Sequence, residues 1–270
     1  MNATITDAEF QLFSKLIYDA SGITFSDMNR SILEGRLRDC MRDKQLDNLD
    51  DYHKLVTTNA EEMKYMLDAV TTNLTRFFRN QPHFDTLVNY VLPRLIEKKK
   101  KQGQSNIKIW SAGCSTGEEP YTIAMVLKKV LPPGITFSIT ASDISLKSIL
   151  VAKQGYYPEN RVAGVEPEYL NKYFTKTGDG YQVIPEIQKT INFDYHNLKN
   201  NSSVINADIV FCRNVLIYFD KPAQLATINC FWNALSADSY LFIGHSESLF
   251  GMDTQFEFVK TDWACIYHKN

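Results

Sequence analysis

The stretch Ser111–Thr122, SAGCSTGEEPYT, combines a glycine turn with two adjacent carboxylates. Glycines such as Gly113 let the backbone approach a ligand closely, and a turn of this kind before a helix often holds phosphate. The sequence here matches neither G-x-G-x-x-G nor G-K-[S/T], the two common phosphate patterns. Carboxylates suit the positive end of a helix dipole but repel a neighbouring phosphate. Glu118 and Glu119 therefore favour a ligand that carries positive charge.

An acidic residue also ends the next strand-like run, ITFSITASD, at Asp143. In open α/β sheets an acid in this place commonly accepts hydrogen bonds from ribose hydroxyls. S-adenosylmethionine joins a nucleoside to an ammonium and a sulfonium and has no phosphate. We therefore expect Glu119 to meet the ammonium, directly or through water, and Asp143 to bind the ribose. A second interpretation stays open, above all for Glu118, namely that the acids only favour the helix start.

Two further strand-like runs also end in residues that suit a nucleoside site. KTINFDYHN is followed by Asn197 and Leu198, one polar and one apolar group for the edge and the face of an adenine. ADIVFC leads to Arg213 and Asn214, with Tyr218 shortly after. Because an unpaired buried charge is costly, Arg213 needs a partner, which is either the ligand or a structural carboxylate.

The segment 70–80, VTTNLTRFFRN, is unlike a simple helix. It gathers polar side chains, among them Asn73, Thr75 and Arg79, around two phenylalanines. We interpret it as a segment that closes over the ligand, and the alternative is a capped helix boundary.

Three regions must position these residues. Helical apolar spacing dominates residues 1–78, which predicts an all-α domain. One of its helices has the apolar stripe Ile32, Leu33, Leu37, Cys40 and Met41. Residues 79–105 are predicted to form a linker helix that Pro93 kinks or breaks. From 106 to 270 strands alternate with helices, which predicts a parallel sheet with helices on both faces. A hairpin signal, GDG, lies within 156–188 and predicts a small β-subdomain inserted there.

Composition narrows the class of protein. The chain has 270 residues, 44% of them hydrophobic and 22% charged, as in an ordinary soluble globular protein. Its net charge of −2 argues against a nucleic-acid partner. We expect no signal peptide, and no membrane insertion because apolar runs stay below about 18 residues. Five scattered cysteines without a CxxC pair predict reduced thiols in the cytoplasm and no metal site.

A basic helix offers a surface for a partner. Arg36, Arg38 and Arg42 lie in the run NRSILEGRLRDCMRDK, and Arg38 and Arg42 share a face at i, i+4. Such a face could dock a glutamate-rich partner, and the alternative is an ordinary solvated helix.

Taken together, the sequence resembles the CheR family of chemotaxis receptor protein-glutamate O-methyltransferases. The resemblance rests on TTNLTRFFRN, WSAGCSTGEEPYTIA, ASDIS, NFDYHNL, FCRNVLIYFD and GHSES, in this order. It implies a Rossmann-like S-adenosylmethionine-dependent methyltransferase sheet, an N-terminal all-α domain and a small inserted antiparallel β-subdomain. The implied ligand contacts are Asn73, Thr75, Arg79, Gly113, Glu119, Asp143, Asn197, Leu198, Arg213 and Asn214.

The resemblance also implies a reaction. Arg79 and Tyr218 would lie nearest the methyl group and position a receptor glutamate, with S-adenosylhomocysteine as the product and without a metal. The partner would be the cytoplasmic methylation region of chemoreceptors, with the basic helix Arg36, Arg38 and Arg42 as its dock, and we expect a monomer. The compact hairpin TKTGDGYQV predicts no dependence on a receptor C-terminal tethering pentapeptide. The alternatives are an NAD-dependent dehydrogenase and a catalytically silent adaptor that senses a nucleoside.

Overall fold

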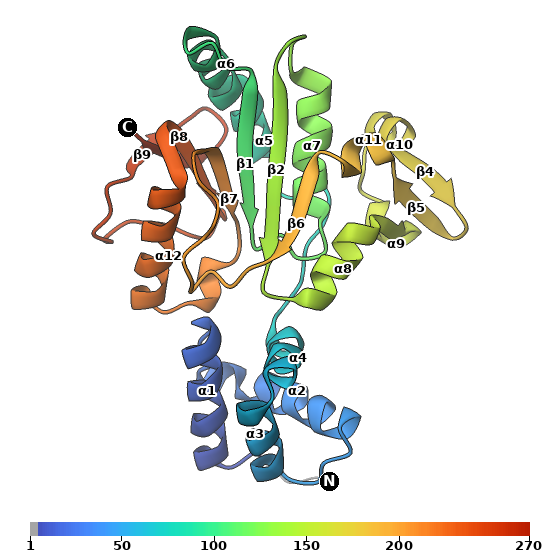
Figure 1. The fold of residues 1–270 in the computed structure, drawn as a ribbon, viewed down its shortest axis with the longest axis vertical. Coiled ribbons are helices and arrows are strands. Elements are labelled where there is room, and N and C mark those ends of the chain that lie inside the picture. The colour runs from blue at the N-terminus through green and yellow to red at the C-terminus, as the bar shows by residue number, and fades with distance from the viewer. Residues whose placement is uncertain (1–4) are drawn as a thin grey trace.

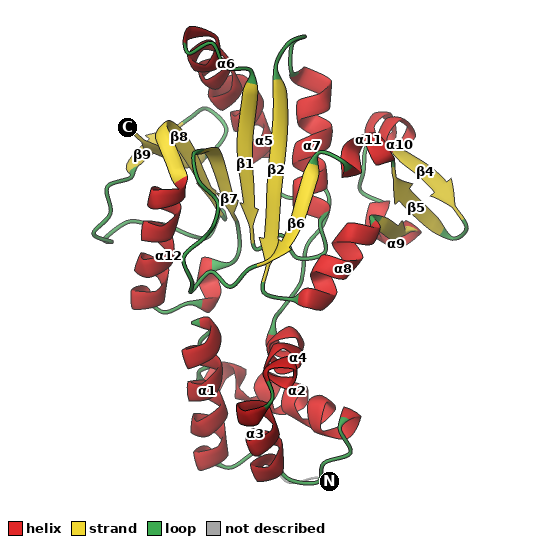
Figure 2. Ribbon diagram, in the orientation of Figure 1, coloured by secondary structure: helices red, strands yellow, loops and turns green. Residues whose placement is uncertain are grey.

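A computed structural model describes residues 5–270 (Figure 1). Residues 1–4 of the predicted 1–78 domain lie outside the described residues. Within that range, helices alone build the N-terminal part, and a large sheet with flanking helices builds the rest (Figure 2). The N-terminal helices pack beneath one end of the large sheet, and a small second sheet lies to its side (Figure 2).

The N-terminal domain is a helical cluster with its own core. Its elements are α1 (Asp7–Ser21), a 3₁₀ turn (Asp27–Asn29), α2 (Arg30–Asp43), α3 (Leu49–Thr58) and α4 (Ala60–Val70). Helix α1 begins with a capping box between Thr6 and Glu9 and ends at Gly22, which has a left-handed φ of 79°. The core gathers apolar side chains from all four helices, among them Phe13, Ile17, Leu33, Leu37, Tyr52 and Met66.

One residue of the predicted apolar stripe does not belong to this core. Leu33, Leu37, Cys40 and Met41 are buried as expected, but Ile32 is 53% exposed. Ile32 lies one position away from the buried row of α2 and faces the cavity described below. Its prediction as a core residue was wrong, because apolar character alone does not distinguish packing against the helix cluster from lining a pocket.

The linker is helical with an interruption. It consists of α5 (Gln81–Thr86), a π-helical turn (Leu87–Val91) and α6 (Leu92–Lys101). Pro93 lies in the first turn of α6, where its missing N–H costs little. The wider π turn precedes it, so the break predicted at Pro93 takes the form of a local change of helix type.

The large sheet has seven strands in the order β6-β2-β1-β7-β8-β10-β9. The strands are β1 (Asn106–Ala112), β2 (Thr136–Asp143), β6 (Ile191–Tyr195), β7 (Ala207–Cys212), β8 (Leu235–Ile243), β9 (Glu257–Lys260) and β10 (Cys265–Lys269). β6, β2, β1, β7 and β8 are parallel, as predicted, whereas β10 runs antiparallel to both β8 and β9. This is the predicted Rossmann-like sheet, with an antiparallel edge.

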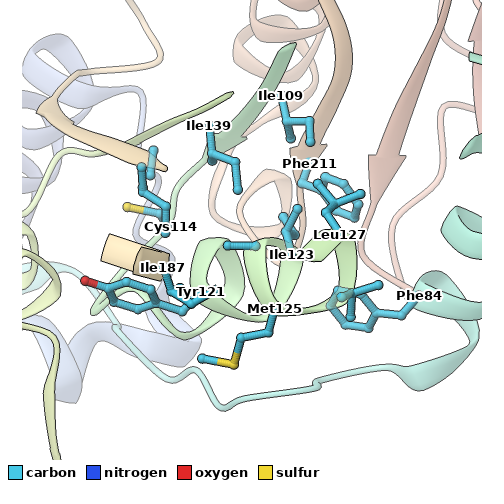
Figure 3. Packing of buried hydrophobic residues seen from close by; sticks show 14 of the residues in the cluster. Phe84, Ile109, Cys114, Tyr121, Ile123, Met125, Leu127, Ile139, Ile187 and Phe211 are labelled. Atoms are coloured by element: carbon cyan, nitrogen blue, oxygen red, sulfur yellow. The ribbon is translucent and has the colours of Figure 1, made fainter. Parts of the chain in front are cut away.

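Helices cover both faces of this sheet. α7 (Glu118–Val130) packs with α5 and α6 on one face, where Ile109, Ile123, Leu127 and Phe211 meet (Figure 3). α12 (Lys221–Ala234) covers the other face, against Trp110. Successive residues of β1 thus enter opposite cores, as the alternation of a strand requires.

The insertion forms a second, three-stranded antiparallel sheet in the order β3-β5-β4. After α8 (Leu146–Gln154) come β3 (Tyr156–Pro158), α9 (Glu159–Val162), α10 (Pro167–Tyr173), β4 (Phe174–Thr177), β5 (Gly180–Val183) and α11 (Pro185–Gln188). The predicted GDG hairpin is confirmed: Gly178, at a φ of 60°, and Asp179 connect β4 to β5.

Candidate active site

A cavity of about 380 Å³ lies at the carboxyl ends of the parallel strands, between the sheet and the N-terminal helices. Gly113, Asp143, His196 and Arg213 enter it directly at the ends of β1, β2, β6 and β7. Open α/β sheets bind ligands in this position. All the predicted ligand and reaction residues line the cavity, namely Asn73, Thr75, Arg79, Gly113, Glu119, Asp143, Asn197, Leu198, Arg213, Asn214 and Tyr218.

The turn after β1 requires glycine at two positions. Gly113 has a φ of 80°, and a Cβ there would lie 2.4 Å from Cγ2 of Val215. Gly117 has a φ of 96°, and a Cβ there would lie 2.8 Å from Cβ of Ala152. Both positions therefore exclude a side chain, and the backbone of the turn lies open to a ligand at Gly113.

Asp143 is buried and organises the same turn. Its Oδ2 accepts a hydrogen bond from the Ser115 amide at 2.7 Å, and its Oδ1 accepts one from the Ser145 amide at 2.9 Å. Burial nevertheless raises the pKa of the carboxyl above its usual value. Each oxygen keeps a lone pair for a further donor, as the predicted contacts to ribose hydroxyls require.

Glu119 is bound to other side chains at both oxygens. Ser111 Oγ donates to Oε1 at 2.8 Å, and Arg213 Nε donates to Oε2 at 2.7 Å. Glu119 and Arg213 are both buried. Arg213 was expected to pair either with the ligand or with a structural carboxylate, and the structure shows a carboxylate. This carboxylate is Glu119, the same residue that we expected to bind the ammonium of the ligand. Glu119 can take up a cationic group only in addition to Arg213.

Arg213 connects this pair to the segment before α5. Its Nη1 donates to the backbone carbonyl of Arg79 at 2.7 Å and approaches Nδ1 of His83 at 3.1 Å. Its guanidinium also lies over the Phe84 ring, 5.3 Å from the centroid. His83 was not among the residues predicted for the site. Burial, and next the Arg213 charge, lower the pKa of His83 to about 4, so the ring is neutral and accepts at Nδ1.

Glu118 does not line the cavity. It is fully buried and pairs with Arg161 of α9, and Thr116 Oγ1 donates to its Oε2 at 2.8 Å. Tyr157 of β3 donates to the Thr116 carbonyl at 2.6 Å. For Glu118 the second interpretation, in which the acid favours the start of its helix, fits better than ligand binding. Glu118 in addition binds Arg161 of the inserted subdomain.

The segment 71–79 is non-helical and passes over the glycine turn. The Asn73 carbonyl accepts from Ser115 Oγ at 3.4 Å, and Asn73 Nδ2 lies 3.5 Å from Ser145 Oγ. Arg79 Nη1 donates to the Leu74 carbonyl at 3.0 Å. This geometry agrees with a segment that covers the ligand site rather than with a simple helix boundary.

The two asparagines at the strand ends differ in their partners. Asn197 Nδ2 donates to the Ala20 carbonyl at 2.7 Å, and its Oδ1 accepts from the Lys199 amide at 3.0 Å. The Asn197 carboxamide therefore binds the N-terminal domain, and only one of its N–H groups remains for an adenine. Asn214 Oδ1, in contrast, is buried without a hydrogen-bond partner among residues 5–270. Asn214 as a residue lines the cavity, so this unused acceptor lies next to the candidate site.

The N-terminal domain supplies a wall of the cavity that the sequence did not reveal. Ile23, Thr24, Phe25, Asn29 and Ile32 line it. The Thr24 amide and hydroxyl both donate to the Tyr218 carbonyl, at 2.9 and 3.0 Å. For the helices of this domain we predicted only a docking role, because helical periodicity does not report which side chains face another domain.

The predicted docking arginines lie on the exposed surface of α2 and not in the cavity. Arg38 pairs with Glu34 at 2.5 Å and Arg42 with Asp39 at 2.8 Å, whereas Arg36 makes no ion pair with any described residue. The other basic residues of the run have structural partners: Arg30 pairs with Asp7 and Lys44 with the buried Glu62.

Within residues 5–270, no helix is long and apolar enough to cross a membrane. Over the same range, no group of three or more His, Cys, Asp or Glu side chains is arranged to hold a metal ion.

Comparison with known proteins covers nearly the whole chain. Residues 73–265 match the family model described as "CheR methyltransferase, SAM binding domain", and residues 8–71 match "CheR methyltransferase, all-alpha domain". A chemotaxis protein methyltransferase of Borreliella burgdorferi is 38% identical over 93% of this chain and 92% of its own length. Chemotaxis protein methyltransferase 1 of Vibrio cholerae is 34% identical over 98% of both chains. The Escherichia coli chemotaxis protein methyltransferase is 33% identical over 93% of this chain and 88% of its own length.

Proposed function

Since this chain belongs to the CheR methyltransferase family, we propose that it transfers a methyl group from S-adenosylmethionine to glutamate side chains of chemoreceptors. The products would be glutamate methyl esters and S-adenosylhomocysteine. One observation of the structure carries most weight: the Asp143 carboxylate at the end of β2 shares a cavity with Arg79 and Tyr218. Acceptors for a nucleoside and donors for a carboxylate thus line one site.

The chain's own groups fit this ligand. Asp143 offers free lone pairs to ribose hydroxyls. Leu198 supplies an apolar surface, and the Gly113 backbone lines the cavity. Glu119, although paired with Arg213, places negative charge at the same wall. When bound, S-adenosylmethionine supplies a methyl group activated by its sulfonium.

The acceptor glutamate needs no general base. A glutamate has an ordinary pKa of about 4.3, so its carboxylate is ionised at neutral pH. The protein's task is then to orient the carboxylate and to exclude water. The Arg79 side chain donates one hydrogen bond to the described residues, to the Leu74 carbonyl, which leaves guanidinium donors for the carboxylate. The Tyr218 hydroxyl, which has no partner among the described residues, supplies a second orienting donor.

The same proposal assigns the exposed row Arg36, Arg38 and Arg42 to docking of the receptor. Receptor methylation regions would bring glutamates, and the arginine row supplies complementary charge on the domain that also walls the cavity. Such a partner places the protein in the cytoplasm, which suits its free thiols. We propose that it acts as a monomer.

We further propose that methylation does not require a receptor-tail pentapeptide. The support is the short hairpin, in which only Gly178 and Asp179 connect β4 to β5. Titration of the protein with a receptor-tail pentapeptide should show no binding in the micromolar range. Micromolar affinity that disappears when the β-subdomain is altered would contradict this part of the proposal.

The decisive experiment is transfer of labelled methyl from S-adenosylmethionine to a panel of chemoreceptor cytoplasmic fragments. Base-labile label on glutamate is expected. Calorimetry with S-adenosylhomocysteine and with NAD separates the rival activities, because a dehydrogenase would bind NAD. Binding of S-adenosylhomocysteine without any methyl transfer would instead favour a silent adaptor.

A further inference from the structure

Glu247 lies in the stretch GHSES, which the proposed function leaves without a role. This stretch follows β8, next to the segment that carries Asn214 and Tyr218. The Glu247 amide donates to the Gly244 carbonyl at 2.9 Å, so residues 244–247 form a tight turn. The half-buried side chain of Glu247 points back across this turn to the neighbouring segment.

The Glu247 carboxylate accepts hydrogen bonds from three backbone amides. Oε2 accepts from the Asn214 amide at 3.0 Å and from the Gly244 amide, and Oε1 accepts from the Ile217 amide at 3.2 Å. One side chain therefore bridges the turn after β8 and both ends of the segment 214–217. Hydrogen bonds to an ionised acceptor are stronger than those between neutral groups.

The space beside the Gly244 Cα is filled by the Glu247 carboxylate and the Asn214 backbone. A Cβ on Gly244 would lie 2.6 Å from Glu247 Oε2 and 2.8 Å from the Asn214 amide nitrogen. Asn214 itself has a φ of 61°, a left-handed conformation that few residues other than glycine adopt. The carboxylate thus fixes both the backbone from which the Asn214 side chain extends and the backbone that leads to Tyr218.

We propose that Glu247 is a positioning residue that fixes the segment Asn214–Tyr218 and thereby the Asn214 and Tyr218 side chains in the cavity. Glu247 does not itself line the cavity, so it acts through the backbone it holds. The inference rests on the proposed function for the roles of Asn214 and Tyr218.

The test is a double-mutant cycle with Glu247→Gln and Tyr218→Phe, measured as kcat with saturating S-adenosylmethionine. The glutamine presents an NH₂ group to one of the three amides and loses the charge. We expect at least a tenfold loss of kcat for Glu247→Gln, and no more than a twofold further loss when Tyr218→Phe is added, because both changes disable one unit. Fully multiplicative losses would show that Glu247 does not act through Tyr218.

Two readouts remain informative if the proposed function fails. S-adenosylhomocysteine affinity is measured for Glu247→Gln, Asn214→Ala and the double variant, and non-additive losses are expected. Amide hydrogen exchange over 213–219 should rise tenfold or more in Glu247→Gln, while exchange in β1 stays unchanged. If the wild type binds S-adenosylhomocysteine but methylates no receptor, the function is wrong and these two readouts still decide the role of Glu247.

A matched control removes a carboxylate elsewhere. Glu257→Gln on the edge strand β9 changes the same charge at an exposed position and should leave kcat, affinity and exchange unchanged. If Glu247→Gln does not fold, Glu247→Asp is the second variant. It keeps the charge, but its side chain is one methylene too short to reach all three amides. Smaller changes in kcat, affinity and exchange in the same direction are then expected. Wild-type exchange over 213–219 in a folded Glu247 variant would overturn the proposal.

Discussion

Arg213 binds Glu119, the Arg79 carbonyl and His83 within one buried cluster. Each contact lowers the cost of burying its charge, and together they fix the backbone at Arg79. Charged side chains in this site therefore have two roles. Glu119 and Arg213 hold each other, whereas Arg79, which keeps guanidinium donors unused, is free to meet a substrate.

Arg79→Ala should lower kcat about a hundredfold, because it removes a donor that orients the acceptor carboxylate. The melting temperature should change little, since the substitution removes the side-chain hydrogen bond to Leu74 and retains the carbonyl that Arg213 binds. Methyl transfer and thermal unfolding are measured on the same preparation. Arg76→Ala, an exposed position of the same segment outside the cavity, is the control. Normal turnover by folded Arg79→Ala protein would contradict the assigned role.

His83 predicts a pH dependence of stability. Its pKa is about 4 in the folded protein and about 6.5 when unfolded, so the unfolded state binds more protons between these values. Its contribution is fully present above pH 6.5 and falls with decreasing pH, by as much as about 3 kcal/mol at pH 4. His83→Gln should flatten this dependence in urea unfolding measured from pH 7.5 to 4.5. A wild-type pH dependence in folded His83→Gln protein would contradict this assignment.

Among the elements, the inserted subdomain has a structural task that its place in the sequence does not suggest. Arg161 of α9 and Tyr157 of β3 both bind the turn that begins α7. The turn carries the glycines of the ligand site, so the insertion supports that site from outside. The ion pair between Arg161 and Glu118 should contribute strongly, because the Glu118 carboxylate is fully buried.

Arg161→Ala should destabilise the protein by about 2–3 kcal/mol, since it leaves the buried Glu118 without its cation, although Arg161 itself is partly exposed. Weaker S-adenosylhomocysteine binding should accompany the loss. Lys129→Ala removes another ion pair between α7 and the insertion, to Glu168, but an exposed one, and should cost less than about 1 kcal/mol. Equal losses in the two variants by chemical denaturation would show that burial of Glu118 is not decisive.

Across the whole molecule, the helical domain is joined to the reaction site by direct hydrogen bonds. Thr24 binds the Tyr218 carbonyl, Ala20 binds Asn197, and Tyr18 donates to Asp220 at 3.0 Å. The domain that bears the arginine row thus also binds two residues that line the cavity, Asn197 and Tyr218. A receptor bound at α2 would lie on the same helical domain as one wall of the cavity.

Arg38→Glu combined with Arg42→Glu should raise KM for receptor fragments at least tenfold and leave S-adenosylhomocysteine affinity unchanged, because the row lies outside the cavity. Added salt should weaken the wild-type reaction in the same way. Lys15→Glu with Lys54→Glu is the charge-matched control on α1 and α3, where each lysine likewise pairs with an acid of its own helix. Unchanged receptor kinetics in the arginine variant would refute docking at α2.

Local sequence was sufficient for much of this protein. Periodicity and turn residues predicted the helical domain, the order of strands and helices, and the GDG hairpin, because spacing and glycine act within a few residues. The rule that parallel strands bring their carboxyl ends together then gathered Gly113, Asp143, Asn197 and Arg213 into one site. These inferences need no knowledge of how distant side chains pair.

Pairing across the chain was beyond the sequence. Glu119 with Arg213, Glu118 with Arg161, and Glu247 with the Asn214 amide join residues far apart in the chain. Ile32 reads as a core residue from its spacing, yet it lines the cavity. Each acid had several eligible partners in the sequence, and packing of the domains selected one, since burial makes an unpaired charge too costly to leave. Residue type and spacing therefore located the site, and three-dimensional packing set which of its groups hold the fold and which remain for a ligand.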